Sequence, residues 1–184
     1  MTSKEQQQFL DNLVDNTANF IAEYQLNKKE GRKTFALPDW SDKHIPVQEW
    51  RGVALWWNYR PWAIYQKYFP LTTSLVRTGP THRATGHLIL NPHSKTPKHR
   101  HLDWGNKIIL HLPLVIPNGD VGFCIEGEIY RWGVGKLFAF DITKEHHGFN
   151  NTDEERVLLV MDFDAEVWGE TLKKYMYMEN LVKV

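Results

Sequence analysis

Histidines and one nearby carboxylate are concentrated in a short stretch of the chain. Residues 91–111, NPHSKTPKHRHLDWGNKIILH, hold four of the nine histidines, and within them His101 and Asp103 are two positions apart. On an extended segment this spacing puts both side chains on one face. His146 follows the apolar run KLFAFD, 45 positions after His101. Two histidines and a carboxylate on one face of a metal form the facial triad that leaves positions open on non-haem Fe(II). The spacing therefore predicts an iron site with room for a co-substrate and O2.

An arginine stands at the start of the next apolar run. Arg156 comes ten residues after His146 and opens RVLLVMDFD, whose interior we expect to be buried. A guanidinium in that position can bind a carboxylate through paired, charge-assisted hydrogen bonds. A lone His-x-Asp would ordinarily be a solvated loop, but together with His146 and Arg156 it favours a metal site. Iron at one end and arginine at the other would suit a dicarboxylate whose oxo-acid end chelates the metal.

The same stretch offers a second register for the metal ligands. His99 and His101 are also two positions apart, so if His99 were the first ligand, His101 would stand where the carboxylate is expected. An all-histidine site is softer and less typical of non-haem iron oxygenases, which favours His101 with Asp103. His93 lies farther from the following strand and has no carboxylate two residues on.

Helices and strands that would position these residues can be read from the apolar pattern. Residues 4–31 have helical spacing, 61–79 can form a second helix interrupted near Pro70, and 165–182 a third. Between 86 and 164, short runs rich in Val, Ile, Leu and Phe are separated by Gly, Pro, Asn and Asp, which is typical of an antiparallel barrel or sandwich. We expect a mainly β core with flanking helices.

The expected organisation is a single domain over residues 1–184. Its parts are a helical N-terminal support (1–80), the β core (84–164) and a C-terminal helix (165–184). The segment EWRGVALWWNYRPW, residues 49–62, holds four tryptophans and two arginines. We favour the packing of a helix against the barrel there. The alternative is that Arg51, Arg60 or a tryptophan lines the substrate pocket, since aromatic walls and a guanidinium suit an amino acid or peptide.

Composition narrows the class of partner. Lys plus Arg and Asp plus Glu number 22 each, so no net charge attracts nucleic acid or a membrane surface. We therefore expect a small-molecule or peptide partner, no nucleic acid and no membrane, and we leave the oligomeric state open. Cys124 is the single cysteine and the start, MTSKEQQQFL, lacks a signal-peptide pattern, which together predict a cytoplasmic protein.

The joint pattern resembles that of a known enzyme family. His-x-Asp, a later His and then Arg is the pattern of Fe(II)- and 2-oxoglutarate-dependent oxygenases. KIILHLPLVIPNG and YRWGVGKLFAFDITKEHHGFNNTDEERVLLVMD, together with the histidine loop before them, resemble the aspartyl/asparaginyl β-hydroxylase family in order and nearly in spacing. The resemblance covers residues 86–164. It implies a double-stranded β-helix (jelly-roll, cupin-like) barrel and a dioxygenase that hydroxylates carbon with Fe(II), 2-oxoglutarate and O2.

Individual roles follow from this resemblance by position. His101 and His146 resemble the iron-binding histidines of the family, and Arg156 the residue that binds the distal carboxylate of 2-oxoglutarate. His111 matches a histidine that helps to hold the co-substrate, although a histidine in an apolar strand can also be a hydrogen-bonded core residue. His87 falls near a serine that contacts the co-substrate in the animal enzymes.

Asp103 is where this chain departs from the animal enzymes, which have glycine there and bind iron through two histidines. Bacterial relatives, including proline hydroxylases, resemble this chain in keeping the carboxylate. The count from His101 to Asn106 also equals that in the related hydroxylases, whereas choosing His99 would require an insertion. The resemblance therefore implies iron ligation by His101, Asp103 and His146.

The substrate implied by the resemblance is a free amino acid, or an aspartyl or other residue in a small peptide. Two alternatives stay open. A cupin-type metal enzyme that does not use 2-oxoglutarate would have no need of Arg156, and a non-catalytic binding barrel would need neither the arginine nor the metal ligands.

Overall fold

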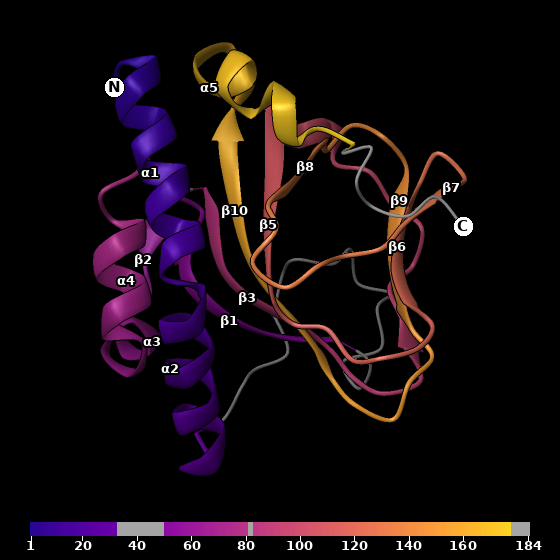
Figure 1. Ribbon diagram of the computed structural model, residues 1–184. Helices are drawn as coiled ribbons and strands as arrows, with labels where there is room; N and C mark the ends of the chain where they lie inside the picture. The colour runs from indigo at the N-terminus through magenta and orange to yellow at the C-terminus, as the bar shows by residue number, and fades with distance from the viewer. Residues whose placement is uncertain (33–49, 81–82, 178–184) are drawn as a thin grey trace.

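Two antiparallel sheets face each other as a barrel in the computed structural model, which describes residues 1–32, 50–80 and 83–177. Helices from both ends of the chain cover the outer face of the larger sheet (Figure 1). The chain is thus mainly β with flanking helices, and its core is the jelly-roll, cupin-like barrel that the sequence predicts. No helix in the described ranges is long and apolar enough to cross a bilayer.

Neighbouring strands in both sheets run antiparallel. The larger sheet has the order β2 (Arg60–Pro61), β1 (Trp50–Trp57), β3 (Ala84–Leu90), β10 (Arg156–Asp164), β5 (Lys107–Val115), β8 (Phe138–Asp141). The smaller sheet has the order β4 (Ser94–Lys95), β9 (His146–Asn150), β6 (Val121–Ile125), β7 (Glu128–Tyr130).

Helical segments precede and follow these strands. They are α1 (Ser3–Asp15), α2 (Thr17–Lys29), α3 (Ala63–Tyr68), α4 (Pro70–Val76) and α5 (Ala165–Leu172), with short 3-10 turns η1 (Leu102–Trp104) and η2 (Lys173–Tyr175). The single helix expected over 4–31 is divided at Asn16, whose side chain donates to the Asn12 carbonyl. Such local side-chain bonds compete with the helical pattern. The break near Pro70 lies where the sequence predicts it. The expected helix from 165 becomes η2 after Leu172, and residues beyond 177 lie outside the described part.

The tryptophan-rich segment is a strand, not the helix that we expected. Residues 50–57 form β1, which pairs with β3 along its length, so the N-terminal support is not wholly helical. Aromatic and β-branched side chains favour this pleated, half-buried position. Trp50 lines the pocket described below. Arg51 lines a separate cavity under the helices, where it pairs with Glu155, and Arg60 is exposed.

Alternation along β10 separates two cores. Val157, Leu159 and Met161 pack under the helices, while Leu158 and Val160 belong to the cluster between the two sheets. Because successive strand residues point to opposite faces, Arg156 shares the inward face with Leu158 and Val160. The barrel interior is therefore where the site must be sought.

Candidate active site

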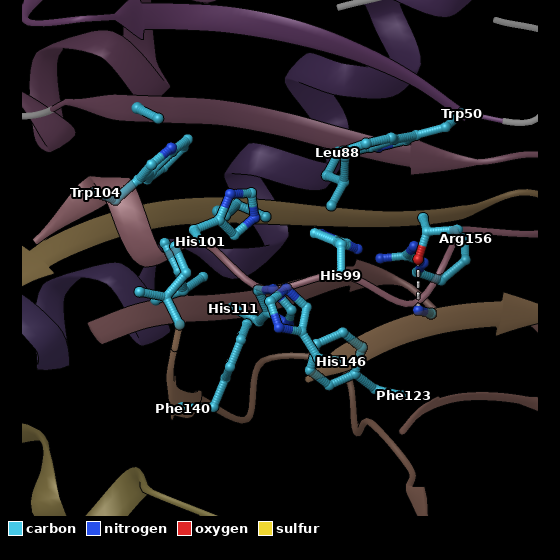
Figure 2. Close-up of a pocket in the computed structure, with 16 residues that line it drawn as sticks. Trp50, Leu88, His99, His101, Trp104, His111, Phe123, Phe140, His146 and Arg156 are labelled. Atoms are coloured by element: carbon cyan, nitrogen blue, oxygen red, sulfur yellow. Dashed lines mark hydrogen bonds between the residues drawn. The ribbon is translucent and has the colours of Figure 1, made fainter. Parts of the chain in front are cut away.

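Three histidines meet at one wall of the barrel interior. His99, His101 and His146 each offer a ring nitrogen, and these nitrogens all lie within 4.8 Å of one another. The His99 and His146 rings are 4.3 Å apart and the His101 and His146 rings 5.6 Å apart, measured between centroids (Figure 2). We call this group the histidine cluster. Imidazole is a good ligand for Fe, Zn, Cu and Ni, so the cluster has the chemistry of a transition-metal site.

Backbone hydrogen bonds fasten the histidine loop to the strand beside it. The amide of Thr96 donates to the Gly148 carbonyl at 2.9 Å, and the Thr96 hydroxyl accepts from the Gly148 amide at 2.8 Å. Further along, His99 and His146 exchange both backbone hydrogen bonds, at 3.1 and 2.9 Å. The loop therefore runs antiparallel to β9, and directly opposed side chains come together on one face.

Two of the three imidazoles are oriented by the backbone. Nδ1 of His99 lies 2.8 Å from the Pro97 carbonyl oxygen, and Nδ1 of His146 lies 2.7 Å from the Lys144 carbonyl oxygen. A carbonyl can only accept, so each Nδ1 carries the proton and each Nε2 has a lone pair. Histidines that bind metals usually have this arrangement. Burial, and secondarily the neighbouring His99, lowers the pKa of His146 to about 3, which keeps that ring neutral at physiological pH.

Asp103 does not join the histidine cluster. The prediction assumed an extended segment after His101, but Leu102–Trp104 form the 3-10 turn η1, and Asp103 is exposed there. The two-residue alternation of a strand does not apply to such a turn. Gly105, with φ of 77°, then redirects the chain into β5. His99 stands in the cluster where the carboxylate was expected.

A buried guanidinium lies in the same pocket as the cluster. Arg156 is 2% exposed, and burial lowers its pKa to about 9, so it remains charged at neutral pH. In the described parts of the chain no carboxylate forms an ion pair with it, and its Nε has no hydrogen-bond partner. The guanidinium lies 4.9 Å from the centroid of the Trp132 ring. A buried charge without a counter-ion is costly, which makes this position a site for an anionic ligand.

Two further polar atoms near Arg156 lack partners among the described residues. They are Nε1 of Trp132 and Nδ1 of His111, and the two rings lie 5.9 Å apart. Burial first, and then the charge of Arg156, lower the pKa of His111 well below its ordinary value. His111 is thus in the pocket as expected. Trp132 was not foreseen, although its place in the matching motif YRWGVGK was a signal.

His87 lies on the opposite face of its strand from the pocket. It pairs in register with Val53 and Leu159, which belong to the core under the helices. Its ring lies 4.5 Å from that of Phe69, and burial lowers its pKa to about 3. The structure therefore does not bring His87 to the pocket, which is lined instead by its neighbour in the chain, Leu88.

The histidine cluster and Arg156 lie in one pocket, which we call the histidine pocket. Its walls are mainly apolar. They consist of Trp50, Ala84, Leu88, Thr96, His99, His101, Trp104, Ile109, His111, Phe123, Phe140, Ile142, His146, Gly148, Arg156 and Val160. Apart from the histidines, Arg156 is the one ionisable side chain among these described wall residues. None of them is Asp or Glu.

Comparison with known proteins places the chain in a family. The family model for aspartyl/asparaginyl β-hydroxylases matches residues 4–166. The chain belongs to this β-hydroxylase family. A curated relative is the ornithine lipid ester-linked acyl 2-hydroxylase of Rhizobium tropici, which is 32% identical over 104 residues. The match covers 55% of this chain and 33% of that protein, so the chain spans about a third of its relative's length.

Solved cupin proteins are similar to this β-hydroxylase family member. A sugar phosphate isomerase from a cupin superfamily, from Silicibacter pomeroyi, has a TM-score of 0.40 and 14% identity, over 62% of this chain and 59% of that chain. A cupin 2 conserved barrel domain protein from Salinispora arenicola has a TM-score of 0.36 and 14% identity, over 50% of this chain and 71% of that chain.

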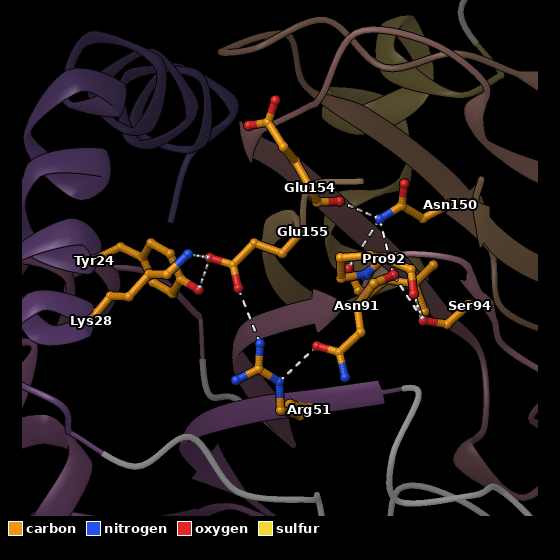
Figure 3. Close-up of polar contacts among 10 residues, drawn as sticks. Tyr24, Lys28, Arg51, Asn91, Pro92, Ser94, Asn150, Glu154 and Glu155 are labelled. Atoms are coloured by element: carbon orange, nitrogen blue, oxygen red, sulfur yellow. Dashed lines mark hydrogen bonds and ion pairs between the residues drawn. The ribbon is translucent and has the colours of Figure 1, made fainter. Parts of the chain in front are cut away.

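A second polar network holds the end of β9 and the start of β10 in this family member. The Asn150 side chain donates to the carbonyls of Asn91 and Glu154, at 3.0 and 2.7 Å (Figure 3). Glu155 accepts from Lys28 of α2 at 2.6 Å and from Arg51 of β1 at 3.0 Å. Because Glu155 precedes Arg156, these contacts fix the point from which the guanidinium enters the barrel.

Proposed function

We propose that this chain is an Fe(II)- and 2-oxoglutarate-dependent dioxygenase that hydroxylates an unactivated carbon. The observation that supports the proposal is the joint placement of the histidine cluster and a buried, unpaired Arg156 in one pocket. A dicarboxylate can satisfy both ends, with its oxo-acid group toward the histidines and its far carboxylate toward the guanidinium. Membership of a hydroxylase family supports the same reaction class.

The residues present fit a bound metal. His101 and His146, the ligands expected from the sequence, are joined by His99, and the ring protons of His99 and His146 point to carbonyls and away from the cluster. We propose these three imidazoles as the protein ligands of the metal, without Asp103. When bound together with 2-oxoglutarate, the iron supplies the activation of O2. A neutral ligand set leaves more positive charge on the metal than a set with a carboxylate, which favours the binding of an anionic oxo-acid.

Arg156 has the task of binding and orienting the co-substrate. Its planar donors match a carboxylate, and burial strengthens a charge-assisted bond. The unpartnered Nε1 of Trp132 and Nδ1 of His111 lie around the same space and can add a donor each, depending on the tautomer of His111. The co-substrate would thus be held by contacts that a monocarboxylic acid cannot make in full.

The apolar walls have the task of excluding water. Phe123 and Phe140 lie 5.6 and 4.8 Å from the His146 ring, measured between centroids, and both are buried. Water-free surroundings limit side reactions at the metal and strengthen electrostatic contacts.

The two alternatives to this proposal explain less of the pocket. A cupin-type metal enzyme without 2-oxoglutarate would use the histidine cluster but would leave Arg156 as an unexplained buried charge. A non-catalytic binding barrel would not require two imidazoles oriented by carbonyls. Measuring iron binding, and then the effect of 2-oxoglutarate on the iron-loaded protein, distinguishes these three candidate functions.

The substrate has two candidate classes within the family. One is a free amino acid or a residue in a small peptide, which the resemblance implied. The other is an acyl chain, because the curated relative is named as hydroxylating an ester-linked acyl group of a lipid. Both would present a C–H bond to the same metal.

Anaerobic titration tests the co-substrate directly. The protein should bind one Fe(II) per chain, and 2-oxoglutarate should then produce the weak visible charge-transfer band of a metal chelate. Succinate, which has the two carboxylates but no oxo group, is the control and should give no band. Iron binding without a band would favour the cupin-type alternative, and no iron binding would favour the binding barrel.

A further inference from the structure

The mouth of the histidine pocket is framed by four residues. Of the residues that line the pocket, Leu88, His99, His101 and Trp104 are half-exposed, and the remainder are buried. Trp104 lies against His101, with ring centroids 4.6 Å apart, and Figure 2 shows Leu88 on the side of Trp50. A substrate that enters beside the metal-binding histidines must therefore pass an aliphatic and an aromatic side chain.

The interior behind this mouth offers little to a polar substrate. Arg156 is engaged by the co-substrate in the proposed function, on which this inference rests. The buried wall residues include the apolar Ala84, Ile142 and Val160. An α-amino group needs a carboxylate partner in a buried place, and no Asp or Glu is found among the described wall residues. An amino acid would thus lose the solvation of its charges without compensation.

The surface outside the mouth continues the apolar wall. Leu102 is 70% exposed, the highest value among the large hydrophobic side chains that the structure describes, and it lies in the η1 turn beside Trp104. Trp104 contacts Trp57 at 5.8 Å between centroids, and Tyr59 at the tip of the β1–β2 hairpin is half-exposed. An exposed leucine in the same turn as a pocket-lining tryptophan gives an alkyl chain an apolar surface outside the pocket.

Charges of both signs stand on this rim. The Arg83 guanidinium lies 4.5 Å from the centroid of the Trp104 ring, and Asp103 is exposed in the same turn as Leu102. Both groups are outside the pocket walls. They can interact with a polar head that stays in water while an apolar chain occupies the interior.

We infer that the substrate of this pocket is an amphiphile whose apolar chain passes between Leu88 and Trp104 to the histidine cluster, with its polar head at Arg83 and Asp103. The walls supply the affinity, because each methylene removed from water contributes to binding. A free amino acid or a short polar peptide is the class that this pocket excludes.

The test uses the cobalt-loaded protein with 2-oxoglutarate present, so that Arg156 is occupied. Hexyl-, octyl- and decyl-phosphocholine are titrated below their micelle concentrations, and binding is followed by the cobalt absorption spectrum and tryptophan fluorescence. Affinity should rise roughly fourfold for each added methylene. Glycerophosphocholine, proline and aspartate should not bind. Binding that is independent of chain length, or binding of the amino acids, would overturn the inference.

Amino-acid substitutions test whether the alkyl chain of the ligand enters at the mouth of the histidine pocket. Leu88→Gln should weaken decyl-phosphocholine by roughly tenfold, and Leu102→Gln, an exposed change that is safe for folding, should weaken it by a few fold. Val167→Gln is the matched control, since Val167 is 59% exposed on α5 and should leave binding unchanged. Cobalt binding by each variant verifies the fold. Equal effects of the three variants would contradict entry at this mouth.

The same titrations separate this inference from the proposed function. If 2-oxoglutarate alters the cobalt spectrum but no alkyl chain binds, the substrate class is wrong and the oxygenase reaction stands. If the alkyl series binds but 2-oxoglutarate has no effect, the proposed reaction is wrong and the pocket still takes an apolar chain.

Discussion

His99 and His146 oppose each other directly as a pair that exchanges both backbone hydrogen bonds, at 3.1 and 2.9 Å. Their rings lie on the same face with centroids 4.3 Å apart, and each Nδ1 is directed to a carbonyl two residues before it in the chain. Backbone geometry therefore brings together two imidazoles whose Nδ1 protons are directed to carbonyls. His101 completes the cluster. Two of the proposed metal ligands are thus positioned by the backbone of the loop and of β9.

Alanine substitutions test which side chains bind the metal. His99→Ala, His101→Ala and His146→Ala should each weaken Fe(II) or Co(II) by more than about 100-fold, since losing even an outer partner of a metal ligand costs about 10- to 100-fold. Asp103→Ala should retain the metal, because that carboxylate is exposed in η1. Metal content after gel filtration and direct titration are the measurements.

His93→Ala is the control for these variants, since His93 is exposed and pairs with Asp153 away from the cluster. Loss of metal in Asp103→Ala, with retention in His99→Ala, would restore the ligand set that the sequence favours.

Substitution of Arg156 tests the co-substrate site. Losing one partner of a desolvated charge pair costs about 2 to 5 kcal/mol, so Arg156→Ala should weaken 2-oxoglutarate by roughly 30-fold or more. Arg156→Lys should be intermediate, because it keeps the charge but loses the paired donors. Calorimetry on the metal-loaded protein gives the affinities, and Arg60→Ala, an exposed change, is the control. Unaltered affinity in Arg156→Ala would argue for an enzyme that does not use this co-substrate.

The burial of His87 predicts a specific sensitivity to acid. Its pKa is about 3 in the folded protein and about 6.5 in the unfolded chain. Between these values the unfolded chain binds a proton that the folded protein does not, so the free energy of unfolding falls as the pH decreases. At pH 5 this group should lower the stability by about 2 kcal/mol relative to pH 7.

His87→Leu should remove that part of the acid sensitivity. Both ring nitrogens of His87 lack partners among the described residues, so the variant should also be at least as stable as the parent at pH 7. Thermal unfolding at pH 7 and pH 5 measures both effects, with the exposed His93→Leu as control. An unchanged difference between the two pH values would show that His87 does not have the lowered pKa.

The sequence predicted the class of fold because alternating apolar runs and turn residues report directly on short, antiparallel strands. Arg156 and His111 both line the histidine pocket, and each lies on a long strand with one face toward the barrel interior, but their roles in binding a co-substrate stay predictions. The choice of metal ligands within residues 99–103 was harder to predict. LDWGN contains Asp, Gly and Asn, which favour a turn, and the turn at Leu102–Trp104 ends the alternation on which the Asp103 prediction depended.

Other misses have similar local causes. His87 was assigned by position next to a matching residue, but a shift of one residue along a strand moves a side chain to the opposite face. The segment 49–62 was expected to be a helix, and its pairing with β3 depends on partners 27 to 40 residues away, which composition alone does not reveal. Pairing with a strand that is distant in the sequence decides whether such a segment forms a strand or a helix.

Gly86 tests the close packing of β1 and β3. A Cβ added at Gly86 would collide with the Val53 carbonyl oxygen, which belongs to the backbone and cannot easily move. Gly86→Ala should therefore destabilise the protein by about 2 kcal/mol or more. Gly169→Ala is the matched control, because Gly169 lies in α5 with nothing within 4 Å of an added Cβ. That variant should stabilise by up to about 1 kcal/mol. Urea unfolding of both variants measures the difference.

Oxidative decarboxylation of 2-oxoglutarate under ¹⁸O2 is the most direct measurement of the proposed activity. Protein loaded with Fe(II) should convert 2-oxoglutarate to succinate that carries one ¹⁸O atom, and an alkyl-phosphocholine should increase the rate and gain one hydroxyl oxygen from ¹⁸O2. Under the same conditions, with 2-oxoglutarate below saturation, His146→Ala should release no labelled succinate and Arg156→Ala far less than the parent. Failure of the iron-loaded parent to form labelled succinate with any of the alkyl amphiphiles, amino acids or short peptides would contradict the assignment as a 2-oxoglutarate-dependent oxygenase.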